Sequence, residues 1–91
     1  IRYAEAVVRT AYRKGKGPVF IERTLYNHDI NLQQVRILVS DVSFDWFESS
    51  KAVRVKRFGD PLPADWTDKQ KQMRFLQYRG FTQEQIKYAF E

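Results

Sequence analysis

The sequence predicts an all-α protein in which two related three-helix units, joined in tandem, form one elongated helical stack. Apolar residues recur at intervals of three and four along most of the chain, which is the spacing of one face of an α-helix. Glycine, proline and cap-forming residues interrupt this pattern where helices would end and begin. The residues around one helix corner also recur further along the chain, which indicates an internal repeat.

The first two helices are bounded by glycine and proline. Residues 1–14 carry alanine and valine on one helical stripe, and Gly15 and Gly17 end that stripe. Pro18 suits the first turn of a second helix, because that position needs no backbone N–H. This second helix is short and is predicted to end near Asn27.

The third helix has the clearest start signal. Asn31 is placed to cap it, and Gln34, three residues later, fits a capping box. Ile30 before the cap and Val35 inside the helix are spaced for a hydrophobic staple. The apolar stripe of this helix is then predicted to comprise Val35, Leu38, Val39 and Val42.

The second half of the chain begins with another helix, predicted over residues 44–58 and ended by Gly59. Pro61 and Pro63 prevent the next segment from being helical throughout, because proline restricts its own backbone and that of the residue before it. This segment is therefore a loop.

Two more helices complete the second half. Thr67 is the predicted cap of the fifth helix, which stops at Gly80. Thr82 is the predicted cap of the sixth helix, with Gln85 three residues later as in a capping box.

The helix corners and starts of the two halves match. Leu25, Ile30, Asn31 and Val35 recur 51 residues later as Leu76, Phe81, Thr82 and Ile86, while Tyr3 and Gly15 recur 44 residues later as Phe47 and Gly59. The difference falls in the proline-rich loop, where an insertion costs little. We therefore divide the chain into a first three-helix repeat, residues 1–42, and a second, residues 43–91, within one continuous module.

The composition excludes several classes of function. The chain has 91 residues, 43% of them hydrophobic and 30% charged, as in a globular domain. It has no cysteine and one histidine, His28, which makes a zinc site improbable. Neither a nucleophile–base pair nor a phosphate-cradling glycine loop can be assembled. We expect a binding protein and no enzyme, with no cofactor and no small-molecule substrate.

The same composition bears on the compartment. The chain lacks cysteine and lacks an apolar run long enough to span a membrane. We therefore expect a cytoplasmic protein with no membrane partner.

Basic side chains are the candidate binding residues. The net charge is +5, and two clusters without acidic residues lie at the ends of the first helix of each unit. Such charges favour an anionic partner, although cations at a helix end also stabilise the helix dipole and a basic surface aids solubility. The candidates are Arg9, Arg13, Lys14 and Lys16 in the first cluster, Lys51, Arg54, Lys56 and Arg57 in the second, and Arg74 and Arg79 near the second.

Four aromatic residues, Trp46, Phe47, Phe75 and Phe81, fall on apolar stripes or staples. We expect them in the core and not in a platform on which nucleic-acid bases would stack.

Two runs of residues resemble the RecX family of recombination regulators. The run from Tyr12 to Pro18, followed by Ile21, Arg23 and Leu25, is similar to the second repeat of that family. The run Lys56-Arg57-Phe58-Gly59, then Lys71, then residues 74–81 and Ile86, is similar to its third repeat. Because the family has another three-helix repeat upstream, and because this chain starts at Ile1 without a methionine or a cap, we expect further residues before it.

The resemblance implies a protein that binds the RecA recombinase filament. Members of the family are expected to lodge in the helical groove of the filament, close to its single-stranded DNA, and to restrain recombinase, ATPase and co-protease activities by occupancy. The residues alone leave two alternatives open, a module that binds DNA without regard to sequence and a helical adaptor for another acidic protein.

Overall fold

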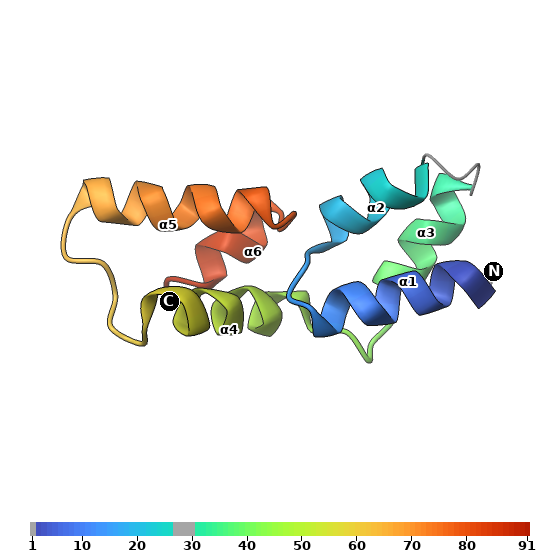
Figure 1. Ribbon diagram of the computed structural model, residues 1–91, viewed down its shortest axis with the longest axis horizontal. Coiled ribbons are helices and arrows are strands. Elements are labelled where there is room, and N and C mark those ends of the chain that lie inside the picture. Colours follow the sequence, from blue (N-terminus) through green and yellow to red (C-terminus); the bar gives the residue numbers. More distant parts are fainter. Residues whose placement is uncertain (1, 27–30) are drawn as a thin grey trace.

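The structure, a computed structural model, describes residues 2–26 and 31–91. Within these residues it contains six α-helices and no strand, which confirms the all-α prediction. The molecule extends over 43 × 22 × 18 Å, and its helices form two triplets placed end to end along the longest axis (Figure 1). None of the helices within the described ranges is long and apolar enough to cross a membrane.

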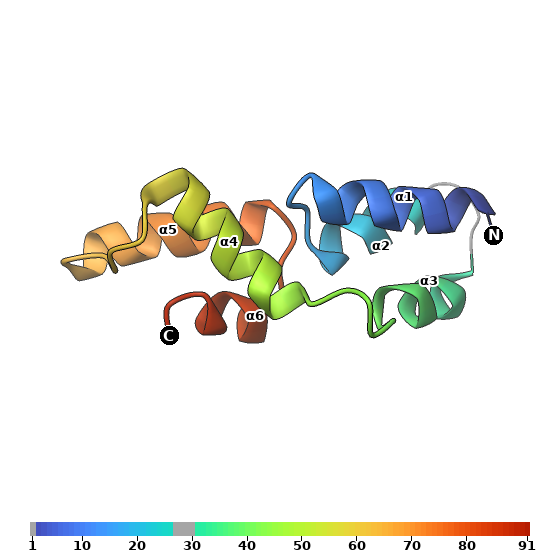
Figure 2. The ribbon, with the colours of Figure 1, turned by 90° about the horizontal axis from the view of Figure 1, so that it is seen from below.

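Each triplet consists of three consecutive helices. The first triplet consists of α1 (Arg2–Arg13), α2 (Pro18–Tyr26) and α3 (Leu32–Val39), and the second of α4 (Trp46–Phe58), α5 (Trp66–Tyr78) and α6 (Gln83–Tyr88). Seen from below, α3 and α6 lie on one side of the molecule, and α1 and α5 on the other (Figure 2). Helix packing occurs mainly within each triplet.

The hydrophobic core runs through both triplets as one cluster of buried residues. Its members are Ala4, Val8, Ala11, Ile21, Leu25, Val35, Val39, Trp46, Leu76, Phe81, Ile86 and Ala89. Each fully buried side chain of the larger kind contributes about 1.5–3 kcal/mol. Among the described residues, the core is therefore continuous from one triplet to the other.

Three aromatic rings close the turn between the triplets. Tyr12, Phe44 and Trp46 lie with their ring centres 5.0–5.5 Å apart. The indole N–H of Trp46 donates a hydrogen bond to the carbonyl of Val39, the last residue of α3. Trp46 and Phe81 are buried as predicted, whereas Phe47 is 41% exposed, which corrects the prediction of a core position.

The helix starts agree with the sequence in part. Thr82 and Gln85 form the predicted capping box, in which each side chain accepts from the backbone N–H of the other residue. The fifth helix is capped by Asp65 and not by Thr67, because the carboxylate of Asp65 accepts from the N–H of Asp68 at 2.8 Å.

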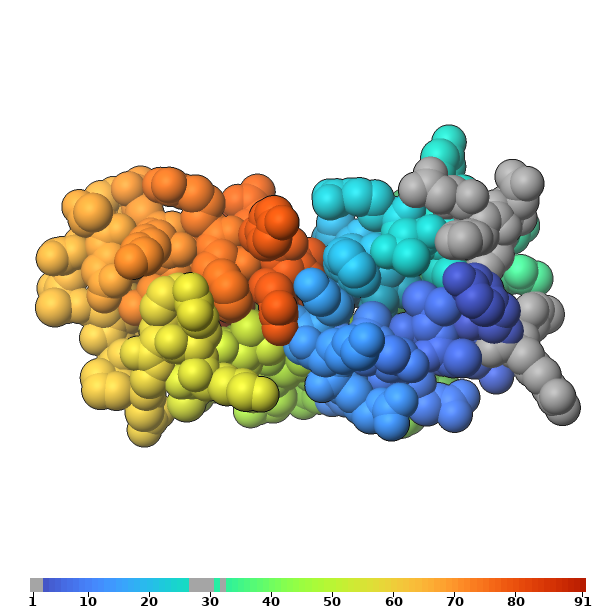
Figure 3. All heavy atoms as spheres, in the orientation of Figure 1, coloured from blue at the N-terminus to red at the C-terminus, as the bar shows by residue number. Residues whose placement is uncertain are grey.

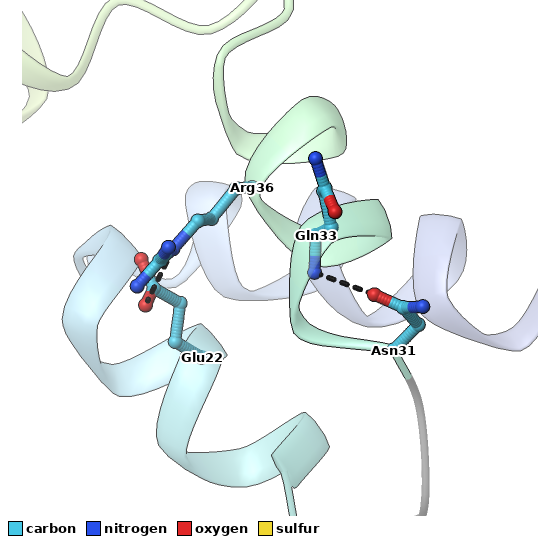
Figure 4. Close-up of polar contacts among 4 residues, drawn as sticks. All are labelled: Glu22, Asn31, Gln33 and Arg36. Atoms are coloured by element: carbon cyan, nitrogen blue, oxygen red, sulfur yellow. Dashed lines mark hydrogen bonds and ion pairs between the residues drawn. The ribbon is translucent and has the colours of Figure 1, made fainter.

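At the third helix, the Asn31 side chain accepts from the N–H of Gln33 at 2.8 Å, and no capping box with Gln34 is formed by these residues (Figure 4). An ion pair of 3.9 Å between Glu22 and Arg36 links α2 to α3 in the same region (Figure 4). The helix ends at Val39, so Val42 lies beyond it and is 99% exposed, contrary to its predicted place in the apolar stripe. His28 and the proposed staple through Ile30 lie outside the described residues.

The contribution of the Asp65 cap to stability can be measured by substitution. Replacing Asp65 by alanine leaves the N–H of Asp68 without its acceptor, and we expect the free energy of unfolding to fall by about 1 kcal/mol. Thr67→Ala is the matched control, since Thr67 is exposed in the first turn of α5, and its effect should stay within about 0.5 kcal/mol. Urea titration of both variants measures the difference, and a larger loss for Thr67→Ala would contradict this cap.

Candidate functional site

The two triplets are joined by direct backbone contact. The segment after α1 meets the corner between α5 and α6, where the N–H of Gly17 donates to the carbonyl of Arg79 and the N–H of Val19 donates to that of Gly80, each at 2.9 Å. We call this contact, formed by residues 14–20 and 79–81, the joint. It fixes how the second triplet is oriented on the first, because hydrogen bonds between two main chains leave little freedom.

The joint needs glycine at both of its central positions. A Cβ atom on Gly17 would lie 2.4 Å from the carbonyl oxygen of Gly80, and a Cβ on Gly80 would lie 2.5 Å from the Cβ of Phe20. Gly80 also has a φ of +97°, which other residues rarely adopt. The two backbones can therefore approach this closely only because neither residue has a side chain.

The side chain of Arg79 adds a third link across the joint. Its Nη2 donates to the carbonyl of Lys14 at 2.9 Å, at the C-terminal end of α1. Its guanidinium group also lies 5.6 Å from the ring centre of Phe75 on α5. A cation at this position interacts favourably with the negative end of the α1 dipole. Arg79 therefore connects the end of α1 to α5.

A groove of about 530 Å³ lies beside the joint, between the end of α1, the middle and end of α4, and α5. In Figure 3 the yellow-green atoms of α4 are set back between the blue atoms of α1 and the orange atoms of α5 in this region. We call it the joint groove. It is lined by Tyr12, Arg13, Lys14, Gly15, Ser49, Ala52, Val53, Lys56, Arg57, Phe75 and Arg79.

The charged side chains that line the joint groove are all basic. Among its described lining residues five are cations, Arg13, Lys14, Lys56, Arg57 and Arg79, and none is acidic. Cations gathered in a concave surface reinforce one another's field and attract an anionic partner more strongly than scattered charges would. The guanidinium of Arg57 lies 5.5 Å from the ring centre of Phe75, so this ring has two guanidinium groups close to it.

The structure thus brings together residues from both predicted clusters. Arg13 and Lys14 from the first cluster meet Lys56, Arg57 and Arg79 of the second at one groove. This convergence results from the joint, which places the end of α1 against the second triplet.

Four other candidates lie away from the joint groove. The Nζ of Lys16 is 4.9 Å from the ring centre of Phe20, within the joint but outside the groove lining, and that of Lys51 is 5.8 Å from the ring centre of Tyr88. Arg9 lines a separate hollow that also contains Glu5 and Asp41, and Arg74 is exposed on α5.

Arg54 departs from the expectation of an exposed binding residue. Its side chain is 1% exposed, and its Nε–H donates to the carbonyl of Ala89 at 2.8 Å. Its Nη atoms lie 3.4 Å from the carbonyl oxygens of Gly59 and Asp60 and 3.5 Å from that of Pro61. Ala89 and Gly59 lie at the C-terminal ends of α6 and α4, so the guanidinium compensates two helix dipoles, while Asp60 and Pro61 belong to the loop after α4. Arg54 therefore links α4 to the end of α6, and its burial leaves it unable to contact a partner at the surface.

The small and apolar residues that shape the joint groove were not predicted as site residues. Ser49, Ala52 and Val53 line it from one face of α4, and their spacing of three and four residues is the signal that places them together. Phe75, predicted as a core residue, is partly buried and forms part of the groove wall.

Among the described residues, Asp41 and Tyr88 have shifted pKa values, and both lie outside the joint groove. Hydrogen bonds from the backbone N–H and the hydroxyl of Ser43 lower the pKa of Asp41. The hydrogen bond that Tyr88 donates to Glu48 raises the pKa of the Tyr88 hydroxyl and links α6 to α4. Within the described part of the chain, no group of three or more acidic, histidine or cysteine side chains is placed to hold a metal ion.

Comparison with known proteins identifies the family. The profile "RecX, third three-helix domain" matches residues 45–90, which contain α4, α5 and α6. The "Regulatory protein RecX" of Serratia proteamaculans is 37% identical over 89 residues, covering 98% of this chain and 53% of that protein. Those of Halorhodospira halophila and Acinetobacter baylyi are 38% and 40% identical over 88 residues, covering 97% of this chain and 55% and 54% of those proteins.

The chain therefore spans about half the length of the curated relatives it matches. The domain profile covers the whole second triplet, and the relatives align with both triplets. On this combined basis, the chain belongs to the RecX family.

Proposed function

We propose that this chain binds the RecA recombinase filament and restrains its recombinase, ATPase and co-protease activities by occupying the helical groove of the filament. The relatives are regulatory proteins by name, and the joint groove supplies the structural observation that carries the proposal. Five cations without an acidic neighbour among the described lining residues offer a surface for the acidic side chains of a partner. Inhibition by occupancy requires binding alone and no bond-making step.

We further propose that residues 1–42 and 43–91 act as two repeats of one module, which the joint keeps in a fixed orientation. The single-stranded DNA of the filament lies close to the bound chain. The protein acts in the cytoplasm, where the filament forms.

A matched pair of variants tests the role of the joint groove. The groove variant carries Arg13→Gln, Lys14→Gln and Lys56→Gln, and the control variant carries Arg9→Gln, Lys71→Gln and Arg74→Gln. All six side chains are exposed, and only the first three line the joint groove. Both variants lose the same charge, so a general effect of net charge is equal in the two.

The measurement is the rate at which RecA hydrolyses ATP on single-stranded DNA as the chain is added. We expect the groove variant to need about tenfold more protein for half inhibition, because three lost ion pairs of about 0.5 kcal/mol each amount to a factor of about ten. The control variant should inhibit like the unmodified chain. Equal inhibition by the two variants would remove the groove from the mechanism.

Direct, sequence-indifferent DNA binding is the second candidate, favoured by the same acid-free group of cations. It predicts an affinity for naked DNA that falls steeply with salt, because bound phosphates release counterions. Binding that is weak on naked DNA and tight on the filament, measured at one salt concentration, would reject it.

A further inference from the structure

Part of the lining of the joint groove is apolar. Ala52 and Val53 of α4 and the ring of Phe75 on α5 belong to it, together with the cations. Val53 and Phe75 also pack against the hydrophobic core, so these side chains are held in place from below. The groove therefore combines an apolar strip with a cationic border.

The aromatic rings of the groove are already engaged. Phe75 has the guanidinium groups of Arg57 and Arg79 within 5.6 Å of its ring centre. The ring of Tyr12 packs edge-on against Phe44 and Trp46, and its hydroxyl accepts a hydrogen bond from the N–H of Asp45. Single-stranded nucleic acids are bound on aromatic rings with open faces, and these two rings do not provide such a platform.

From these observations we propose that the joint groove binds an acidic polypeptide segment whose carboxylates flank one apolar side chain. The apolar side chain lies on Ala52 and Val53, next to Phe75. The carboxylates on either side of it pair with Lys56 and Arg57 at one border and with Arg13 and Lys14 at the other.

This occupant explains both properties of the groove, whereas a phosphodiester backbone would use only the charges. A sugar–phosphate chain has no aliphatic side chain to cover the apolar strip, and its bases would find no open ring. The inference rests on the proposed function only in using the same groove as the docking surface. It names the chemistry of the partner and can be tested without a filament.

The test uses short synthetic peptides labelled with a fluorophore. One peptide consists of aspartate and glutamate residues around a single central leucine, and the second has serine in place of the leucine. An oligothymidylate of matched charge serves as the nucleic-acid probe. Fluorescence anisotropy at one fixed salt concentration gives the affinity of the unmodified chain for each.

We expect the leucine peptide to bind about tenfold more tightly than the serine peptide, because burial of a leucine side chain favours binding by at least that factor. The groove variant should lose this binding and the control variant should keep it. Val53→Thr, which has nearly the same shape, should reduce the preference for leucine and leave the far-ultraviolet circular dichroism of the chain unchanged.

Equal binding of the two peptides would overturn the inference, as would tighter binding of the oligothymidylate. These outcomes are distinct from a failure of the proposed function. Loss of filament binding with retained peptide selectivity would overturn RecA as the partner and leave the chemistry of the groove intact. Filament binding without peptide selectivity would overturn the proposed chemistry of the groove and leave RecA as the partner.

Discussion

Replacing Gly80 by alanine is expected to lower the free energy of unfolding by about 3 kcal/mol or more, and to open the joint. The new Cβ would lie 2.5 Å from the Cβ and 2.6 Å from the backbone nitrogen of Phe20, so the start of α2 would have to move. Overpacking of this kind costs about 1–3 kcal/mol, and the positive φ of Gly80 adds a further cost of about the same size. Movement of α2 would also break the hydrogen bonds that Gly17 and Val19 donate across the joint.

Gly59→Ala is the matched control for this prediction. Gly59 also has a positive φ, +94°, but a Cβ there would meet only the Cδ of Pro61 at 3.7 Å, an ordinary contact. Its substitution therefore measures backbone strain without a clash. For a chain of this size, the melting temperature of Gly80→Ala should lie about 10 °C below that of Gly59→Ala.

Hydrogen exchange gives a second readout, at the joint itself. The N–H groups of Gly17 and Val19 should exchange much faster in Gly80→Ala than in Gly59→Ala, since their acceptors lie across the joint. Equal melting temperatures with equal protection of these two amides would show that the joint is looser than the close backbone contact indicates.

Replacing Arg54 by methionine is expected to lower the free energy of unfolding by about 2–3 kcal/mol. Methionine fills most of the space, but the carbonyl of Ala89 loses a charged donor at 2.8 Å, and the carbonyls of Gly59 to Pro61 lose the positive charge next to them. A buried hydrogen bond to a charged group contributes about 1.5–3 kcal/mol. The C-terminal ends of α4 and α6 should therefore separate first.

Lys56→Met on the same helix is the control, because Lys56 is exposed and its substitution should change stability by no more than about 0.5 kcal/mol. Denaturant unfolding followed by circular dichroism compares the two variants. If Arg54→Met were as stable as Lys56→Met, the guanidinium would not be the link between the two helix ends.

The role of Arg54 also limits how the binding surface can be tested. A charge reversal at this position would place a carboxylate among carbonyl oxygens in the core of the second triplet. Loss of filament binding by such a variant would report unfolding and not a lost contact. The groove variant avoids this difficulty because its three side chains are exposed.

The helices could be predicted from the sequence because their signals are local. Thr82 and Gln85 lie three residues apart, and the capping box they form needs nothing from the rest of the chain. The sequence predicts the cap of α5 two residues too late, because Asp65 and Thr67 are both good caps by type. Only the backbone conformation, extended at Asp65, decides between them.

The spacing of residues in α4 indicates that Arg54 is buried, whereas the basic residues near it in the sequence indicate exposure. Trp46, Ser50 and Arg54 follow one another at intervals of four and are all buried on one face of α4. Because Arg54 belongs to a cluster of four basic residues, however, composition alone favours exposure of its side chain. The carbonyl groups that make burial of this arginine possible come from two places. Ala89 is far from Arg54 in the sequence, and the loop after α4 has no regular pattern from which its contacts could be predicted.

The joint groove could not be predicted from the sequence, because it depends on contacts between residues far apart in the chain. Gly17 and Gly80 were recognised as helix-ending glycines, but not as partners in one backbone contact. That contact brings Arg13 and Lys14 to Lys56 and Arg57. The sequence therefore predicts the two basic clusters, but it does not predict that residues of both line one groove.

If the joint groove docks on the filament, the unmodified chain and the control variant should co-sediment with RecA filaments formed on single-stranded DNA. The groove variant and Gly80→Ala should remain largely in the supernatant. Both losses are expected because the first removes the charges of the joint groove and the second its geometry. Pelleting of the groove variant to the same extent as the control variant would contradict the claim that the joint groove docks on the filament.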